Sequence, residues 1–275
     1  MNLSVVIITY NEEANLARTL ASVKPLVADG KGEIIVVDSG STDRTVEIAK
    51  SFGAKVFIEE WKGYAAQKNS AIDKATGDWI LSLDADEEIS EEMRKLLPLI
   101  LFPPPGKGYA GMGLRFARRN YFLGRWIRHG GFWPDVKLRM FWRGLGRFED
   151  RTVHEDISLK PGCDVVAPSQ EFDVGSSVAI IHHSYPTLYD YIEHMNHYSS
   201  LGAEMVAAKG KDKVRFSVTN IVLRPLLTFV YNYFFRLGFL DGREGLLLHL
   251  YHAVYVSWKY AKAWELSRSQ NKLSS

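Results

Sequence analysis

Two carboxylates follow an apolar run and could hold a metal ion. Asp84 and Asp86 come directly after Trp79-Ile80-Leu81-Ser82-Leu83, whose composition is typical of a buried strand. At the end of a strand, one carboxylate can face a metal while the other binds a sugar or a water. Carboxylate oxygens suit Mg²⁺ and Mn²⁺, and both ions also bind diphosphate. The pair therefore predicts a metal site, although a solvated turn can carry the same residues.

Polar residues also follow two other short apolar runs. Leu3 to Ile8 precedes Thr9, and Glu33 to Val37 precedes Asp38. Strands that alternate with helices at this spacing predict a parallel, doubly wound α/β sheet. Ligands bind outside the carboxyl ends of the strands in such sheets. We therefore expect these polar residues to meet Asp84 at one edge of the sheet.

Four motifs stand in order along the first 90 or so residues. They are Val6-Ile7-Ile8-Thr9-Tyr10-Asn11-Glu12, Val36-Val37-Asp38-Ser39-Gly40-Ser41-Thr42-Asp43, Lys68-Asn69 and Leu83-Asp84-Ala85-Asp86-Glu87. Their order and spacing resemble those of family 2 glycosyltransferases. These are inverting enzymes with the GT-A fold, an α/β fold with a Rossmann-like mixed sheet. The resemblance implies transfer of a sugar from a nucleoside diphosphate donor.

The resemblance also implies a role for each matched residue. The residues that would contact the donor are Thr9, Tyr10, Asn11, Glu12, Asp38, Lys68, Asp84, Ala85 and Asp86. Asp38 would accept a hydrogen bond from the base, which in this family is usually uracil, and Lys68 would lie near the diphosphate. Asp86 would bind Mn²⁺ or Mg²⁺ directly, and Asp84 would contact the ribose, the metal or its water. The cation would neutralise charge that builds on the leaving diphosphate.

An inverting enzyme of this family also needs a general base for the acceptor hydroxyl. The family carries an acidic residue downstream, and Thr152-Val153-His154-Glu155-Asp156 matches that position. Glu155 is the first candidate for the base and Asp156 is the second. His182 follows the short apolar run Ala179 to Ile181, and the resemblance implies that it contacts the metal or the diphosphate. A purely structural histidine fits the same position equally well.

The second half of the chain resembles one branch of the family. Val153-His154-Glu155, His182 with Ser184-Tyr185, and Gly238-Phe239-Leu240-Asp241-Gly242 are similar to segments of bacterial lipopolysaccharide inner-core β-glucosyltransferases. That resemblance implies a lipid-anchored saccharide as the acceptor. Two alternatives stay open: a polyprenyl phosphate acceptor, and a nucleotide-binding membrane adaptor without catalysis.

Charge is unevenly distributed along the 275 residues, although the net charge is only +2. Residues 115–151 and 209–275 each carry a net charge of +7. Such a basic segment indicates either a binding site for an anionic partner or a solvent-exposed surface. In the first segment, His129, Arg139 and Arg143 could bind an anionic acceptor or the diphosphate. No nucleic-acid-binding module is recognisable, so we expect no nucleic-acid partner.

Residues 214–266 combine apolar runs with arginines, lysines and aromatic residues. No run reaches the roughly 18 apolar residues of a spanning helix. The composition predicts helices at a membrane interface, or helices packed on the core or in an oligomer. We expect a glycosyltransferase domain at 1–208 and an amphipathic, membrane-associating helical appendage at 209–275. With the single cysteine Cys163 and no signal peptide, this predicts a peripheral protein on the cytoplasmic face of the inner membrane.

Overall fold

The chain forms two compact units. A computed structural model describes residues 1–102, 109, 111–149, 156–168, 177–208 and 216–273, with side chains as far as residue 268. Unit 1 comprises Met1–Arg119 and Asp135–His182, and unit 2 comprises Asn120–Pro134 and His183–Ser275. These units divide the chain at positions other than residue 208. The predicted boundary between a catalytic domain and a helical appendage at residue 208 stays a prediction.

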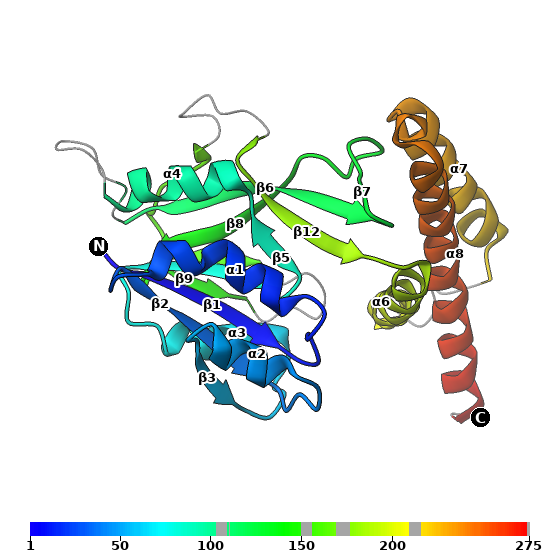
Figure 1. Cartoon of the computed structure of the whole chain (residues 1–275). Helices are drawn as coiled ribbons and strands as arrows, with labels where there is room; N and C mark the ends of the chain where they lie inside the picture. The colour runs from blue at the N-terminus through cyan, green and yellow to red at the C-terminus, as the bar shows by residue number, and fades with distance from the viewer. Residues whose placement is uncertain (103–108, 110, 150–155, 169–176, 209–215, 274–275) are drawn as a thin grey trace. The chain divides into compact units, whose positions relative to one another are not determined.

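Unit 1 is built on a mixed sheet with the strand order β3-β2-β1-β4-β8-β6-β12-β5 (Figure 1). Its strands are β1 (Leu3–Thr9), β2 (Gly32–Asp38), β3 (Lys55–Ile58), β4 (Trp79–Asp84), β5 (Glu87–Ile89), β6 (Gly113–Phe122), β8 (Asp135–Trp142), β11 (Val165–Val166) and β12 (Ala179–Tyr185). Strands β6 and β12 continue into unit 2 beyond Arg119 and His182. Its helices are α1 (Leu16–Val27), α2 (Thr45–Ser51), α3 (Tyr64–Asp73) and α4 (Glu91–Leu101). A separate hairpin joins β9 (Gly146–Phe148) to β10 (Ile157–Leu159).

The first four strands run parallel, as the alternation of strands with helices predicts. β1 pairs with β2 and β4, and β2 pairs with β3, all in parallel register. Beyond β4 the sheet becomes mixed: β8 adds to β4 and β6 adds to β8 in the antiparallel direction, and the short strand β11 pairs with β6 in parallel. The predicted α/β class with a mixed sheet is therefore confirmed, while a purely parallel sheet is confined to its first four strands.

Alternate residues of the central strands face two separate cores. Val5 and Ile7 pack with Leu16 and Leu20 of α1 and with residues of α4 on one face. Val6 and its neighbours on adjacent strands pack with residues of α3 on the other face. This alternation follows from the two-residue period of a strand, and burial on both faces explains the continuous apolar runs. Helices α1 and α4 on one side and α3 on the other are visible in Figure 1.

Unit 2 is mainly helical. Its elements are the ends of β6 and β12, β7 (Arg125–Trp126), α6 (Leu188–Ala208), a π-helical turn η3 (Thr219–Leu223), α7 (Arg224–Val230), a second π-helical turn η4 (Tyr231–Phe235), a 3₁₀ turn η5 (Gly238–Asp241) and α8 (Gly242–Leu273). Phe122, Ile127, Tyr191 and Leu248 form its apolar core. The predicted C-terminal helices are thus confirmed. In the part of the chain that the structure describes, none of the helices is both long and apolar enough to span a membrane.

A buried carboxylate ties the strand-derived part of unit 2 to its helices. Asp241 is 2% exposed and accepts hydrogen bonds from the backbone N–H groups of Arg128 and His129, the latter at 2.8 Å. The Nδ1 atom of His129 lies 3.0 Å from the same carboxylate. This explains Asp241 within its Gly-Phe-Leu-Asp-Gly motif as a structural residue. It also gives His129, expected as an anion-binding candidate, a partner inside the protein.

His249 of α8 is enclosed in unit 2 without a hydrogen-bond partner for either ring nitrogen among the described residues. The residue is 1% exposed, and its ring lies 5.7 Å from that of Phe132. Burial, and then the charge of His252, lower the pKa of His249 to about 4, against the opposing effect of Asp241. The folded protein therefore favours the neutral ring.

The lowered pKa of His249 predicts that the protein loses stability in mild acid. Between pH values of about 6.5 and 4 the unfolded chain binds a proton that folded His249 does not, so stability falls as the pH falls through that window. From pH 7 to pH 5 the wild type should lose about 2 kcal/mol more unfolding free energy than His249→Leu. Urea denaturation at the two pH values measures this difference. An equal pH dependence in both proteins would contradict a neutral, buried His249.

Candidate active site

The first, second and fourth motifs meet at the carboxyl edge of the parallel strands. Thr9 stands opposite Asp38 in the pairing of β1 with β2, and Ile8 stands opposite Asp84 in the pairing of β1 with β4. The hydroxyl of Thr9 donates a 2.8 Å hydrogen bond to the Asp38 carboxylate. The sheet thus brings together three segments that the sequence places far apart, as expected for a ligand edge.

Asp38 organises the turn that follows β2. It is fully buried, and its carboxylate accepts bonds from the Gly40 N–H at 3.0 Å and from the Ser41 N–H at 2.8 Å. The Ser41 and Thr9 hydroxyls donate to its other oxygen. Four donors occupy the roughly four lone-pair positions of the carboxylate. A hydrogen bond from a nucleotide base to Asp38, as predicted, therefore requires one hydroxyl to turn away.

The turn after β1 is held against this second loop. Asn11 adopts a left-handed backbone conformation with a φ of 54°, and its side chain accepts a hydrogen bond from the Thr42 N–H at 2.9 Å. The Glu12 N–H donates to Thr45 at 2.7 Å. Tyr10 is 59% exposed, which leaves its ring free to stack on a flat ligand. These hydrogen bonds join the two loops into a rim at the strand edge, and the Tyr10 ring is exposed on it.

Lys68 and Arg139 hold Asp84 between them. The Lys68 ammonium lies 2.7 Å from one carboxylate oxygen, and a guanidinium nitrogen of Arg139 lies 2.7 Å from the other. Burial alone would raise the pKa of Asp84, but the charges of Arg139 and Lys68 outweigh it and hold the pKa well below its usual value. Both oxygens are thus committed to protein partners, although 27% of the side chain is exposed. Asp84 is ionised and fixed in orientation.

Glu87 extends this ion pair into a buried cluster. It is fully buried and accepts bonds from Arg139 at 2.6 Å and from Arg118 at 3.1 Å. Its second oxygen accepts the backbone N–H of Asp84 at 3.0 Å. Arg118 also pairs with Asp135 at 2.7 Å. We call these six residues the ionic cluster: Lys68, Arg118, Arg139, Asp84, Glu87 and Asp135. These six residues carry three positive and three negative charges, and Lys137 adds a further, longer ion pair at 3.8 Å to Asp135.

The cluster changes the interpretation of the basic segment 115–151. Arg139 is 5% exposed and paired twice, so its described partners are carboxylates of the protein instead of an anionic acceptor or the diphosphate. Arg143 donates to the Gly77 carbonyl at 2.8 Å. The expected anion-binding role of these two arginines has no support in their contacts. Sequence spacing could not reveal the cluster, because Arg139 and Asp84 are 55 residues apart.

Asp86 lies outside the ionic cluster and faces His182. A carboxylate oxygen of Asp86 lies 3.1 Å from Nε2 of His182, and the two side chains are 25% and 17% exposed. Burial raises the pKa of Asp86, but the neighbouring His182 outweighs it and lowers that pKa. Strand pairing explains the contact, since His182 of β12 stands opposite Glu87 of β5.

The Asp86–His182 pair suits a metal ion that is also coordinated by the phosphate groups of a bound substrate. Among the residues that the structure describes, no group of three or more His, Cys, Asp or Glu side chains could hold a metal ion. Mg²⁺ is commonly bound by one or two carboxylates together with substrate phosphates and water. The Asp86 carboxylate matches that donor set for Mg²⁺ or Mn²⁺, and the imidazole of His182 adds a neighbouring nitrogen donor. Asp84 fits it less well, because both of its oxygens already have cationic partners.

The two candidate bases differ in what can be said of them. Glu155 lies outside the described residues. Asp156 is exposed and immediately precedes β10, and its carbonyl accepts the Glu149 N–H at 3.1 Å. The β9–β10 hairpin is joined to α3 by two 2.9 Å hydrogen bonds between the Asn69 amide and the Phe148 backbone.

The same hairpin reaches Lys68. The ring of Phe148 lies 5.1 Å from the Lys68 ammonium, which itself holds Asp84. Asp156 therefore stands directly before β10, in a strand pair that contacts Lys68 of the ionic cluster through Phe148. Asn69 belongs to the third motif, and its hydrogen bonds explain why an amide follows the lysine there. The motif identifies the residue, whereas its partner Phe148 could not be found from the sequence.

Comparison with known proteins agrees with this geometry. The sequence model described as glycosyl transferase family 2 matches residues 4–156. This chain belongs to glycosyl transferase family 2. An uncharacterized glycosyltransferase of Rickettsia typhi is 30% identical to this family 2 chain over 99% of its length and 90% of the relative's. The lipopolysaccharide core biosynthesis glycosyltransferase LpsC of Rhizobium meliloti is 29% identical over 96% and 92% of the two chains.

A solved structure also resembles the whole family 2 chain. TarS of S. aureus, crystallised in complex with UDP, aligns with a TM-score of 0.49 and 18% sequence identity. The alignment covers 98% of this chain and 92% of that one. From the family match and the observed mixed sheet, the predicted GT-A fold and the predicted glycosyltransferase class are confirmed. The individual roles predicted for the site residues stay predictions.

The buried ion pairs of Arg139 predict a large contribution of this residue to stability. Replacing it by leucine leaves Asp84 and Glu87 without their shared partner, which should lower the unfolding free energy by about 3–5 kcal/mol. Arg147→Leu is the matched control, since its ion pair with Asp73 is more than half exposed and should cost within ~1 kcal/mol. Urea denaturation compares the two variants. Equal losses would mean that the cluster does not organise the site.

Proposed function

We propose that this family 2 glycosyltransferase transfers a sugar, with inversion, from a UDP-linked donor to a hydroxyl of a lipid-anchored saccharide of the bacterial envelope, such as lipopolysaccharide core. The observation that carries the proposal is the pair Asp86 and His182 beside an Asp84 that Lys68 and Arg139 hold ionised. The near full-length similarity to LpsC, whose name assigns it to lipopolysaccharide core biosynthesis, supports the acceptor class.

The donor would bind along the rim formed by the strand-end loops. Exposed Tyr10 offers a stacking surface for the base, and Asp38 offers an acceptor once a hydroxyl moves. The turn that contains Asp84, Ala85 and Asp86 would then face the ribose and diphosphate. Because Asp84 is fixed by two cations, its role would be to orient a ribose hydroxyl or a metal-bound water without rearrangement.

Asp86 and His182 would hold a divalent cation, Mn²⁺ or Mg²⁺, together with diphosphate oxygens. When bound, such an ion stabilises negative charge on the departing diphosphate. Glu12 lies in the same electrostatic neighbourhood, because burial and the nearby carboxylates Asp86, Asp43 and Asp84 raise its pKa while Asn15 opposes the shift. A cation at Asp86 would relieve this repulsion.

The acceptor hydroxyl would lose its proton to an acidic residue that stands between β9 and β10 in the sequence. Glu155 is the first candidate and Asp156 the second, and attack would proceed in line on the anomeric carbon. Support comes from the contact of the β9–β10 hairpin with Lys68 through Phe148. The catalytic domain would span residues 1–208, and residues 209–275 would attach it to the cytoplasmic face of the inner membrane or to a second copy.

Removal of the base gives the most informative test. With UDP-sugars, Mn²⁺ and a lipid-linked saccharide fraction, Glu155→Gln should slow transfer by roughly 10²–10⁴-fold while leaving the affinity for UDP unchanged. Asp156→Asn is the matched control and should retain most of the rate. Transfer of radiolabelled sugar measures the rate, and calorimetry with UDP and Mn²⁺ measures binding.

The other outcomes separate the alternatives. A reversed pattern would make Asp156 the base. Near-normal turnover of both variants, and of the variant with both substitutions, would favour a polyprenyl phosphate acceptor, which is already anionic. Binding of UDP with neither hydrolysis nor transfer of any nucleotide sugar by the wild type would favour a non-catalytic adaptor.

A further inference from the structure

Unit 2 carries a helical segment whose side chains are almost all outside the core. Within η3, α7 and η4, spanning residues 219–235, the only buried residue is Pro225. The large apolar side chains Val218, Leu226, Leu227, Tyr231, Phe234 and Phe235 are 53–75% exposed. We call residues 218–240 the apolar segment. Soluble proteins rarely expose contiguous apolar surface on this scale unless it binds something.

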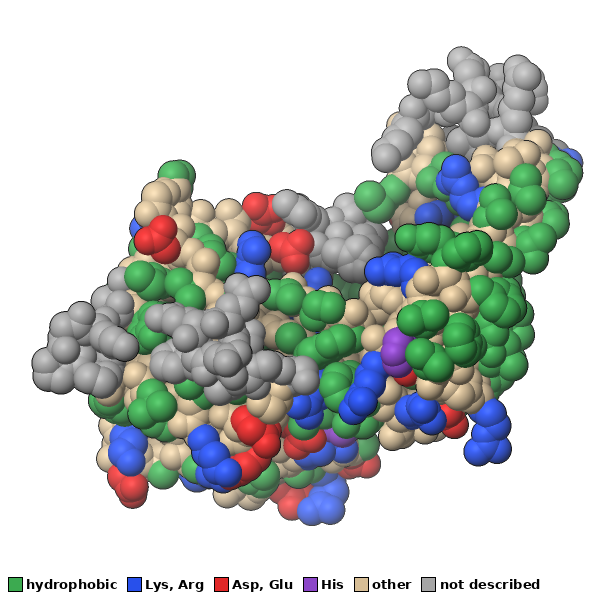
Figure 2. All heavy atoms as spheres, turned by 90° about the horizontal axis from the view of Figure 1, so that it is seen from above, with side chains coloured by type: hydrophobic (Ala, Val, Ile, Leu, Met, Phe, Trp, Pro, Cys, Tyr) green, Lys and Arg blue, Asp and Glu red, His purple; other side chains and the backbone are tan. Residues whose placement is uncertain are grey.

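Hydrophobic side chains gather over the helices of unit 2 in the space-filling view (Figure 2). At the end of the apolar segment, Leu237, Phe239 and Leu240 are also 43–50% exposed. Exposed residues occur on η3, on α7 and on η4 alike. A protein partner that packs on one helix face would cover one stripe of such a segment. A fluid apolar medium can cover all of its projecting side.

The charge of the segment is of one sign. From residue 214 to residue 240 the sequence contains no aspartate or glutamate. Its described charged residues are Arg224 and Arg236, both exposed. The guanidinium of Arg224 lies 5.0 Å from the ring centre of Tyr260, and that of Arg236 lies 5.9 Å from the ring centre of Tyr231. Cations beside tyrosines and apolar residues are typical of the boundary between lipid headgroups and acyl chains.

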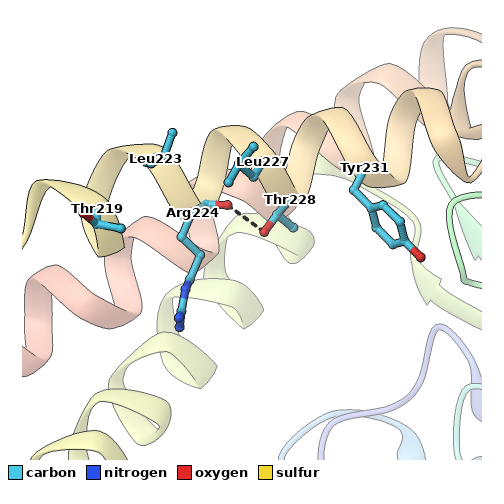
Figure 3. Close-up of a pocket in the computed structure, with 6 residues that line it drawn as sticks. All are labelled: Thr219, Leu223, Arg224, Leu227, Thr228 and Tyr231. Atoms are coloured by element: carbon cyan, nitrogen blue, oxygen red, sulfur yellow. Dashed lines mark hydrogen bonds between the residues drawn. The ribbon is translucent and has the colours of Figure 1, made fainter.

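A shallow, open groove marks where a headgroup would meet the segment. It is lined by Thr219, Leu223, Arg224, Leu227, Thr228 and Tyr231. In Figure 3, Arg224 and Tyr231 project from the same side of the helix, and Leu223 projects from the other. Residues seven apart share a helix face, which explains the shared direction. A cation beside hydroxyl groups suits a phosphate, and the leucines suit an acyl chain.

We propose that the apolar segment inserts as an in-plane anchor into an anionic bilayer leaflet, with Arg224 and Arg236 binding lipid phosphates. Positive charge without acidic residues favours the anionic leaflet, and no described helix is able to span the bilayer. This anchor deepens the proposed function and rests on it for its purpose, because an enzyme held in the leaflet meets a lipid-anchored acceptor there. The anchor names the residues and the kind of surface that the membrane contact needs.

Vesicle binding of the full chain tests the anchor. The wild type should co-sediment with vesicles of phosphatidylcholine and phosphatidylglycerol, and less with phosphatidylcholine alone. Phe234→Ser combined with Phe235→Ser should weaken binding to the mixed vesicles about tenfold or more, since both side chains lose apolar burial. Arg224→Gln combined with Arg236→Gln should remove most of the preference for the anionic vesicles. The control is Ile58→Ser combined with Trp61→Ser, which are similarly exposed in unit 1 and should bind as the wild type does.

Two results would overturn the anchor. One is equal vesicle binding by the wild type and the phenylalanine variant. The other is a wild type that does not bind vesicles but forms a dimer without lipid, measured by light scattering, which the phenylalanine variant does not form. The segment would then bind a second copy of the chain. Hydrolysis of UDP-sugars, measured without vesicles, reports on the proposed function separately. All of the substituted side chains are exposed, so the variants should fold.

Discussion

The site depends on one buried interaction, the guanidinium of Arg139 between Asp84 and Glu87. Burying two carboxylates beside each other is costly unless cations and hydrogen bonds compensate for the lost water. Here Arg139, Lys68 and Arg118 supply the charge, and the backbone N–H of Asp84 supplies a further bond to Glu87. The pairing also spans strands β4, β5, β6 and β8, so it joins the parallel part of the sheet to the antiparallel part. The same buried contacts therefore stabilise the sheet and hold Asp84 in its orientation.

The ionic cluster gives the two aspartates different surroundings. Asp84 is neutralised by the protein and held still, whereas Asp86 projects beyond the cluster toward His182. A ligand that brings its own negative charge, such as a diphosphate, can share a cation with Asp86 without disturbing the cluster. Unit 2 has a different set of features. Its buried Asp241 binds backbone N–H groups of the same unit, and many side chains of its apolar segment are exposed. The proposed sugar transfer and the proposed membrane contact would thus use separate sets of residues.

The sequence was sufficient for β1, β2 and β4. Their apolar runs are largely buried, so composition alone marks them, and the ends of β1 and β4 differ from prediction by a single residue. The family followed from four short motifs in this region. The ionic cluster could not be predicted, because Arg118, Asp135 and Arg139 come from antiparallel strands with poor periodicity and meet partners tens of residues away. Arg139 seemed available to an anion for the same reason. Likewise, no local signal pairs Asn69 with Phe148.

Diffraction from crystals grown with UDP and Mn²⁺ tests the central claim most directly, because anomalous scattering locates manganese. The account predicts a manganese peak against the carboxylate of Asp86 and the imidazole of His182, with Asp84 still bound to Lys68 and Arg139. Asp86→Asn should remove the peak and leave the ionic cluster in place. Manganese bound directly by Asp84, or an Asp84 side chain turned away from Arg139 in the complex, would contradict the division of roles between the two aspartates.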